Sequence, residues 1–151
     1  MAVDMNQAEI DEFLLGQPTL ILCINRPGKA PLPVPMAYGW RDGAAYMHTL
    51  AASPKVGLLR RDPIVSLIAE DSGTGYFSLK SVIVEGTAEV SEDPDVVAAY
   101  RRIIDETKPD LVSRRPEQWP AQLERFYQRP RAAIKVTATR YKTWDFAKIP
   151  R

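Results

Sequence analysis

The sequence predicts a mainly β fold of the α+β class, in which about six antiparallel strands form a small barrel flanked by a few short helices. Three observations support this prediction. Asp42-Gly43 is a strong hairpin signal, because both residue types accept the positive φ angles of a tight turn. Apolar and polar residues alternate over 82–90, which is the period of a strand with one buried face. The 13 prolines among 151 residues are too many for a mainly helical chain.

The first half of the chain has the pattern helix, strand, strand, strand, helix. Asn6 followed by Glu9 is typical of a capping box at a helix start. Ser53 and Pro54 predict a second helix, because they supply an N-cap and a proline at the first helical position. Three prolines within 29–35 indicate an irregular entry into a strand at the edge of the sheet. The expected helices cover 5–15 and 54–60, and the expected strands cover 20–25, a segment from 29–35 to about 40, and 45–49.

The second half of the chain predicts three further strands and two helices. The apolar stretch 64–69 suits a central strand, and 72–75 supplies a turn after it. The strand 82–90 presents its valines to one face and its glutamates to the other. The remaining elements are a helix over 93–104, a polar loop over 108–120, a helix over 121–128, a strand over 134–139 and an aromatic tail of Tyr141, Trp144 and Phe146.

The composition indicates one domain over 1–151 without a strong charge of either sign. The 20 basic and 19 acidic side chains leave a net charge of +1, so we expect no nucleic-acid or membrane partner, and any anion site must be local. One cysteine and one histidine cannot supply the nitrogen and sulfur ligands of a zinc site, and no metal is expected. The acidic N-terminus does not resemble a signal peptide, and no apolar run suits a membrane helix, which favours a cytoplasmic location.

The common catalytic motifs are missing from the sequence. It has no glycine-rich dinucleotide fingerprint, no phosphate-binding P-loop, no zinc-protease helix motif and no serine-hydrolase elbow. His48 is the only histidine, and no nucleophile is marked beside it, so we favour a structural or binding role over general-base catalysis. Catalytic residues therefore stay unassigned.

The segment from His48 to Arg61 combines a strand end, a capped helix and several basic side chains. The free amides at the start of the helix, together with Thr49, Ser53 and Lys55, would form a cradle for a phosphate group. Such a cradle suits a phosphorylated cofactor. In the alternative interpretation Ser53 only caps the helix, and the basic side chains lie on a solvated face.

Several short segments, taken in order, carry a resemblance to a known family. They are PVPMAY at 33–38, DG at 42–43, HT at 48–49, SPK at 53–55, LLRRDP at 58–63, VSL at 65–67, VEGTA at 84–88 and YKTWDF at 141–146. Their order and spacing resemble the split-barrel flavin-binding family related to pyridoxamine 5'-phosphate oxidase. More narrowly, they are similar to its actinobacterial flavin- and deazaflavin-dependent reductase branch. The resemblance extends from about Phe13 to Phe146 and implies a six-stranded antiparallel split β-barrel.

The resemblance also implies how a cofactor phosphate is held. By analogy with the family, Thr49, Ser53 and Lys55 would bind the phosphate. Arg60 and Arg61 would extend this contact, or meet the longer anionic tail of a deazaflavin. The implied cofactor is therefore FMN or the deazaflavin coenzyme F-420, and the sequence does not choose between them.

The same resemblance places the redox ring along the backbone of the second strand. Its polar edge would meet the amides of Val34, Pro35, Met36 and Ala37. Family members are homodimers with the cofactor at the interface, so Trp144 would close the site of the partner chain, or else pack on its own barrel. If the cofactor is the deazaflavin, hydride would pass from its C5 to the substrate, and solvent, Tyr38 or His48 would then supply the proton.

The implied function is an oxidoreductase that transfers hydride between the phosphorylated flavin-type cofactor and a small organic substrate. The alternative is a non-catalytic flavin- or haem-binding protein of the same fold, because a site without acid and base groups serves storage equally well. A third interpretation, an anion- or oligonucleotide-binding barrel, conflicts with the neutral net charge.

Two departures from the family pattern bear on the substrate. Pro54 stands where pyridoxamine phosphate oxidases have an arginine before the lysine, and their C-terminal motif with Arg and His is missing. Both departures argue against pyridoxamine phosphate as the substrate. The long segment 91–131 adds helices, which we expect to cover an open sheet edge rather than to shape a substrate pocket.

Overall fold

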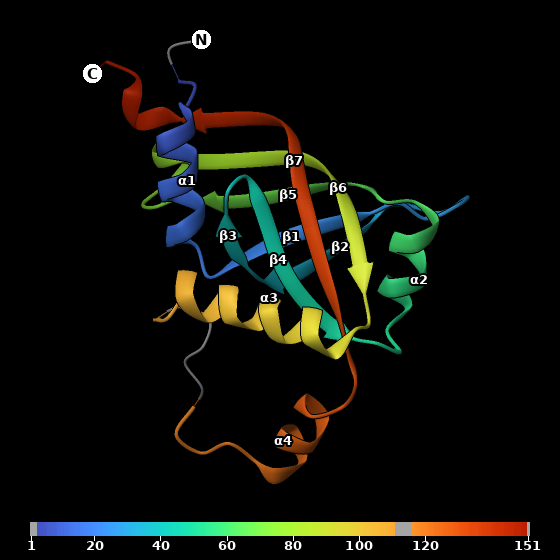
Figure 1. Ribbon diagram of the computed structural model, residues 1–151. Helices are drawn as coiled ribbons and strands as arrows, with labels where there is room; N and C mark the ends of the chain where they lie inside the picture. The colour runs from blue at the N-terminus through green and yellow to red at the C-terminus, as the bar shows by residue number, and fades with distance from the viewer. Residues whose placement is uncertain (1–2, 111–115, 151) are drawn as a thin grey trace.

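In the computed structural model, which describes residues 3–110 and 116–150, seven strands form one antiparallel sheet that curls into a half-barrel (Figure 1). The strand order across the sheet is β2-β1-β5-β6-β7-β4-β3. The strands are β1 Thr19–Ile24, β2 Leu32–Ala37, β3 Gly39–Arg41, β4 Ala44–Leu50, β5 Ile64–Asp71, β6 Lys80–Ser91 and β7 Arg131–Asp145. The described residues also form the helices α1 Gln7–Gly16, α2 Pro54–Arg61, α3 Pro94–Thr107 and α4 Ala121–Tyr127, with short 3-10 turns η1 Tyr76–Ser78 and η2 Phe146–Lys148.

The core is formed by alternate strand residues that face the inside of the curl. Leu22, Met47, Leu67 and Ile134 are almost completely buried there. The alternation expected over 82–90 is confirmed, because the valines at 82 and 84 are buried while Glu89 is exposed. The predicted antiparallel, mainly β fold is therefore correct, with one strand more than expected.

The extra strand arises because the segment expected to form one strand up to residue 40 forms two. β2 lies at one edge of the sheet and β3 at the other. The chain passes between them at Tyr38, which is fully buried and donates its hydroxyl to the carbonyl of Leu14 at 2.5 Å. The two edges close toward each other here, as the curl of the sheet requires (Figure 1).

The last strand is also longer than predicted. β7 continues through Tyr141 and Trp144, which we expected in an aromatic tail beyond the strand. It pairs with β6 along its length, with a bulge where the register shifts between Glu85 and Gly86. A bulge lets a strand bend sharply without losing its partner, and Figure 1 shows β7 bending around the barrel.

Helix α3 packs along the sheet at β3 and β4, and α4 lies beyond it (Figure 1). The N-cap Asp93 accepts from the amide of Asp95 and starts α3, as its sequence predicts. Val97 and Ile104 are the buried residues of its apolar face. Among the residues that the structure describes, no helix is long and apolar enough to cross a membrane.

Candidate functional site

The turn between β4 and α2 is fixed by backbone hydrogen bonds. The amide of Ala51 donates to the carbonyl of Pro130 at 2.9 Å, and the amide of Ser53 donates to Leu50 at the same distance. The Ser53 hydroxyl accepts from the amide of Lys55 at 3.4 Å and caps α2. The predicted helix start is therefore confirmed, and the turn is anchored to the start of β7.

A cavity of about 890 Å³ opens at this turn. This size lies within the range of small-molecule and cofactor sites. It brings together residues of β2, the end of β4, the start of α2 and the α3–α4 segment. Of the residues predicted from the sequence, it contains Pro35, Met36, Ala37, His48, Thr49, Ser53 and Lys55.

Lys55 is the cation that this cavity holds at the start of α2. Its side chain is half-buried, and no carboxylate of the described residues forms an ion pair with it. The start of α2 adds the partial positive charge of a helix N-terminus. The free amides expected there are not present, because Pro54 has no N–H and the amides of Lys55 and Val56 donate to Ser53. The cavity therefore has a local site for an anion, although the whole chain is nearly neutral.

His48 lies on the wall of the cavity and is uncharged at neutral pH. Burial lowers its pKa to about 4, and the nearby charges of Arg101 and Arg131 act in the same direction, while Asp105 opposes them. The Nδ1 atom of His48 is buried and has no hydrogen-bond partner among the described residues. A buried polar atom without a partner is costly, so a bound ligand that hydrogen-bonds Nδ1 would be stabilised there.

The outer edge of β2 supplies backbone groups to the cavity. Proline is tolerated in a sheet only where its nitrogen points away from the neighbouring strand. Pro33 and Pro35 therefore mark the positions of β2 that face away from β1, and Ala37 continues the same series. Because prolines carry no N–H, Ala37 is the donor among these three positions. The expectation that all four amides of 34–37 meet a ring is corrected accordingly.

Four predicted site residues do not line this cavity. Arg60 forms an ion pair with Glu92 at 2.7 Å, and Arg61 is exposed at the far end of α2. Val34 packs against the hydrophobic core instead of pointing outward. Trp144 lies opposite Ser81 at the other end of β7 from Arg131, so it is outside the cavity of its own chain.

Tyr38 is also unavailable as a proton donor to a ligand. It is fully buried, its hydroxyl is bonded to Leu14, and the Nζ of Lys108 lies 3.7 Å from the centre of its ring. Burial raises the pKa of Tyr38 far above its ordinary range. Its proposed role in protonation is therefore withdrawn, and its observed role is to hold the crossing between β2 and β3.

Sequence reasoning missed the part of the wall that comes from the α3–α4 segment. This wall contains Arg101, Ile104, Asp105, Pro116, Trp119, Phe126 and Tyr127, and Arg131 at the start of β7 also lines the cavity. We expected 91–131 to cover a sheet edge, and α3 does pack on the edge strand β3. The same helix also shapes the cavity, so the two roles are combined. The amphipathic pattern of α3 predicts its buried face, but it gives no signal for what the rest of the helix adjoins.

The sequence profile of the pyridoxamine 5'-phosphate oxidase family matches residues 7–145 of the chain. The chain belongs to this family. The match covers every strand and every helix that the structure describes, and the half-barrel is the split-barrel fold of this pyridoxamine 5'-phosphate oxidase family. The resemblance found in the sequence is thereby confirmed.

Solved structures agree with this family assignment. The conserved hypothetical protein Rv2991 from Mycobacterium tuberculosis is 28% identical with a TM-score of 0.78, and the alignment covers 99% of this chain and 92% of that one. A FAD-binding protein from Mesorhizobium loti is 18% identical with a TM-score of 0.67, covering 92% of each chain. An F420 reductase is 20% identical with a TM-score of 0.60, covering 87% of this chain and 94% of that one. None of the curated proteins compared with the chain matches it.

Proposed function

We propose that this chain is an oxidoreductase that binds a phosphorylated flavin-type cofactor, FMN or coenzyme F-420, in the cavity between β2, β4 and α2. The observation that carries the proposal is Lys55, a half-buried cation at a helix start inside a cavity of cofactor size, with no ion pair to any carboxylate in 3–110 or 116–150. Proteins of the same fold that are described as an F420 reductase and as a FAD-binding protein support a cofactor of this class. When bound, such a cofactor supplies hydride transfer to a small organic substrate.

The start of α2 would hold the phosphate. Lys55 contributes a full positive charge, and the start of α2 contributes the partial positive charge of the helix dipole. Thr49 is buried beside them at the end of β4 and offers a hydroxyl. Ser53 already uses its oxygen as the cap, so its hydroxyl proton is what it offers to an anion.

The ring would lie between the edge of β2 and His48. Ala37 donates its amide along the β2 edge, and His48 offers the unpartnered Nδ1 from the opposite wall. Because His48 is neutral, it forms a hydrogen bond without adding charge beside the ring. The protein's contribution is orientation and exclusion of water, which is consistent with the absence of a recognisable catalytic motif.

The resemblance further implies a homodimer with the cofactor at the interface. We propose that Trp144, which lies outside the cavity of its own chain, belongs to the interface and approaches the cavity of the partner. The exposed rings of Tyr76 and Phe77, which lie near Phe146 just beyond this end of β7, support the proposal.

Side-by-side titration of the purified protein with FMN and with coenzyme F-420, followed by fluorescence, tests the proposed function. We expect one of the two to bind, and we expect Lys55→Ala to weaken that binding by about 1.5–3 kcal/mol, the range for a hydrogen bond to a charged group. Lys142→Ala is the matched control, since Lys142 is an exposed lysine on β7 outside the cavity. Equal affinity of the Lys55→Ala variant and the wild type for the cofactor would contradict the proposed phosphate site.

A turnover assay separates the two functions that this site can serve. The protein loaded with reduced cofactor is mixed with a quinone, and oxidation of the cofactor is followed by absorbance. An oxidoreductase accelerates this reaction over the free cofactor. A storage protein binds the cofactor with the same dependence on Lys55 but does not accelerate its oxidation.

A further inference from the structure

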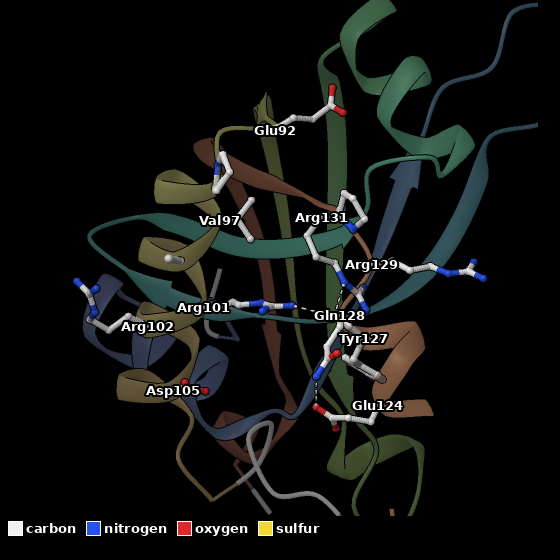
Figure 2. A pocket seen from close by; sticks show the side chains of 13 residues that line it. Glu92, Val97, Arg101, Arg102, Asp105, Glu124, Tyr127, Gln128, Arg129 and Arg131 are labelled. Atoms are coloured by element: carbon white, nitrogen blue, oxygen red, sulfur yellow. Dashed lines mark hydrogen bonds between the residues drawn. The ribbon is translucent and has the colours of Figure 1, made fainter. Parts of the chain in front are cut away.

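A second cavity, of about 780 Å³, lies between α3 and α4 (Figure 2). It shares Arg101, Asp105, Tyr127 and Arg131 with the cavity described above. The two cavities therefore adjoin each other across one wall. The proposed cofactor site does not use this second space, which is large enough for part of a small organic molecule.

Two guanidinium groups meet at the shared wall. Arg101 from α3 and Arg131 from β7 both donate to the carbonyl of Tyr127 at 3.4 Å, and Arg131 also donates to Phe126 at 3.4 Å. The Arg131 guanidinium lies 4.8 Å from the centre of the Tyr127 ring. The end of α4 thus holds the two side chains close together, as the dashed lines in Figure 2 show.

This arrangement favours an anion for two reasons. Two positive charges held close together repel each other, and an anion between them removes this cost. Each guanidinium has five N–H donors, and the bonds to α4 occupy one donor of Arg101 and two of Arg131. Burial and the charge of Arg101 lower the pKa of Arg131, which agrees with a crowded, partly desolvated pair.

The surroundings of the pair select the kind of anion. Four arginines and three carboxylates line the cavity, which gives a net lining charge of +1. Arg102 and Arg129 point away from the pair in Figure 2. A monocarboxylate matches this balance better than a phosphate dianion, which would face the nearby acidic groups. The remaining wall includes Val97, Ala98 and Pro130, which suit a hydrocarbon body.

We propose that the cavity between α3 and α4 binds the carboxylate of a small apolar monocarboxylic acid through Arg101 and Arg131. The remainder of the acid reaches across the shared wall toward His48, where the proposed cofactor site begins. The further step that this acid is the substrate rests on the proposed function. Binding of the acid does not rest on it, because Arg101 and Arg131 are held together by α4 without any cofactor.

Isothermal titration calorimetry with trans-cinnamate and its neutral amide, trans-cinnamamide, tests the proposal on the protein with and without its cofactor. The two probes share the same body and differ in charge. We expect cinnamate to bind at least tenfold more tightly than the amide, and we expect Arg101→Gln to remove this preference. Arg125→Gln is the matched control, because it removes the same charge from α4 outside both cavities and should keep the preference.

A second pair of measurements keeps the test decisive if Arg101→Gln perturbs folding. In the wild type, inorganic phosphate at equal concentration should leave cinnamate binding unchanged, and Arg131→Lys should reduce the preference for cinnamate, because lysine keeps the charge but loses the planar fork. Equal binding of the two probes to the wild type, or displacement of cinnamate by phosphate, would overturn the proposal.

The outcomes also separate this inference from the proposed function. If neither FMN nor coenzyme F-420 binds but cinnamate still shows its arginine-dependent preference, the proposed function fails and the carboxylate site stands. If the cofactor binds with its dependence on Lys55 and cinnamate shows no preference over its amide, the carboxylate site fails alone.

Discussion

At the scale of single residues, His48 links the stability of the fold to pH. Its pKa is about 4 in the folded protein, below the ordinary value of 6.5, because burial disfavours the charged imidazolium. Between these two values the unfolded chain therefore binds more protons than the folded one. Above pH 6.5, His48 is neutral in both states and costs the folded protein no stability. As the pH falls from 6.5 toward 4, the free energy of unfolding decreases.

Replacing His48 by Gln should remove this loss. We expect the free energy of unfolding of the wild type to fall between pH 7 and pH 4.5 by about 1–3 kcal/mol more than that of His48→Gln. Urea unfolding of both proteins at the two pH values gives this difference directly. Carboxylates titrate in the same range, but they are common to both proteins and cancel in the comparison. Identical pH dependence in the two proteins would show that the imidazole is not desolvated.

The residues of the site that could be predicted are those whose positions follow from a local sequence pattern. Ser53 and Lys55 belong to a cap and its helix, and their positions follow from three adjacent residues. Arg101 and Arg131 lie far apart in the sequence, and they meet only because the end of α4 lies between them. No local pattern encodes such a meeting, so it could not be predicted from one sequence.

At the scale of elements, Gly39 sets how closely α3 approaches the sheet. A Cβ at this position would lie 2.8 Å from Oγ1 of Thr107 and 3.0 Å from Cα of Ile104. The second neighbour is helix backbone, which cannot move without shifting α3. Gly39→Ala should therefore destabilise the fold by about 1–3 kcal/mol, the usual cost of overpacking.

Gly57→Ala is the matched control for this substitution. Gly57 lies inside α2, and nothing lies within 4 Å of the position its Cβ would take. Alanine there should stabilise the protein by about 0.4–1 kcal/mol, because it reduces the freedom of the unfolded chain. Urea midpoints of the two variants should therefore move in opposite directions. A shift of both in the same direction would contradict the close packing of α3 on β3.

The elements that were predicted well are those whose ends carry their own signals. The capping box at Asn6, the hairpin at Asp42 and the N-cap at Asp93 all form as expected. The errors occur where tertiary packing decides instead. The chain leaves β2 at the buried Tyr38 and re-enters the sheet at its other edge, and β7 continues through the aromatic residues because β6 pairs with it to the end.

At the scale of the whole molecule, the curl of the sheet brings strands and helices from distant parts of the chain to one cavity. The edge strand β2 and the end of β4 form one side of this cavity, and residues of α3 and α4 form another part of its wall. The barrel could be predicted from alternation and turns, and the family resemblance supplied the proposal that α2 binds a phosphate. The contribution of 91–131 depends on how the segment folds back, which composition and periodicity do not encode.

The proposed homodimer would form through an aromatic surface near Trp144, at the end of β7 away from the cavity. Tyr76 and Phe77 are 68% and 70% exposed, and their rings lie 5.4 and 6.3 Å from that of Phe146. A contiguous aromatic surface of this kind is typical of an interaction site, because large aromatic side chains gain most when they leave water. Trp144 is two residues from Phe146, so docking here would carry it toward a partner.

We therefore expect the protein to sediment as a homodimer at micromolar concentration, with twice the chain mass of 16.9 kDa. Phe77→Ser should weaken the dimer by at least tenfold, because it removes an exposed ring while leaving the core unchanged. Leu123→Ser is the control, since Leu123 is an exposed apolar residue of α4 and should leave sedimentation unaltered. A wild-type protein that stays monomeric at these concentrations would contradict the interfacial cofactor. A dimer that is insensitive to Phe77→Ser would contradict an interface centred on this aromatic surface, because large aromatic side chains at the centre of an interface carry much of its binding energy.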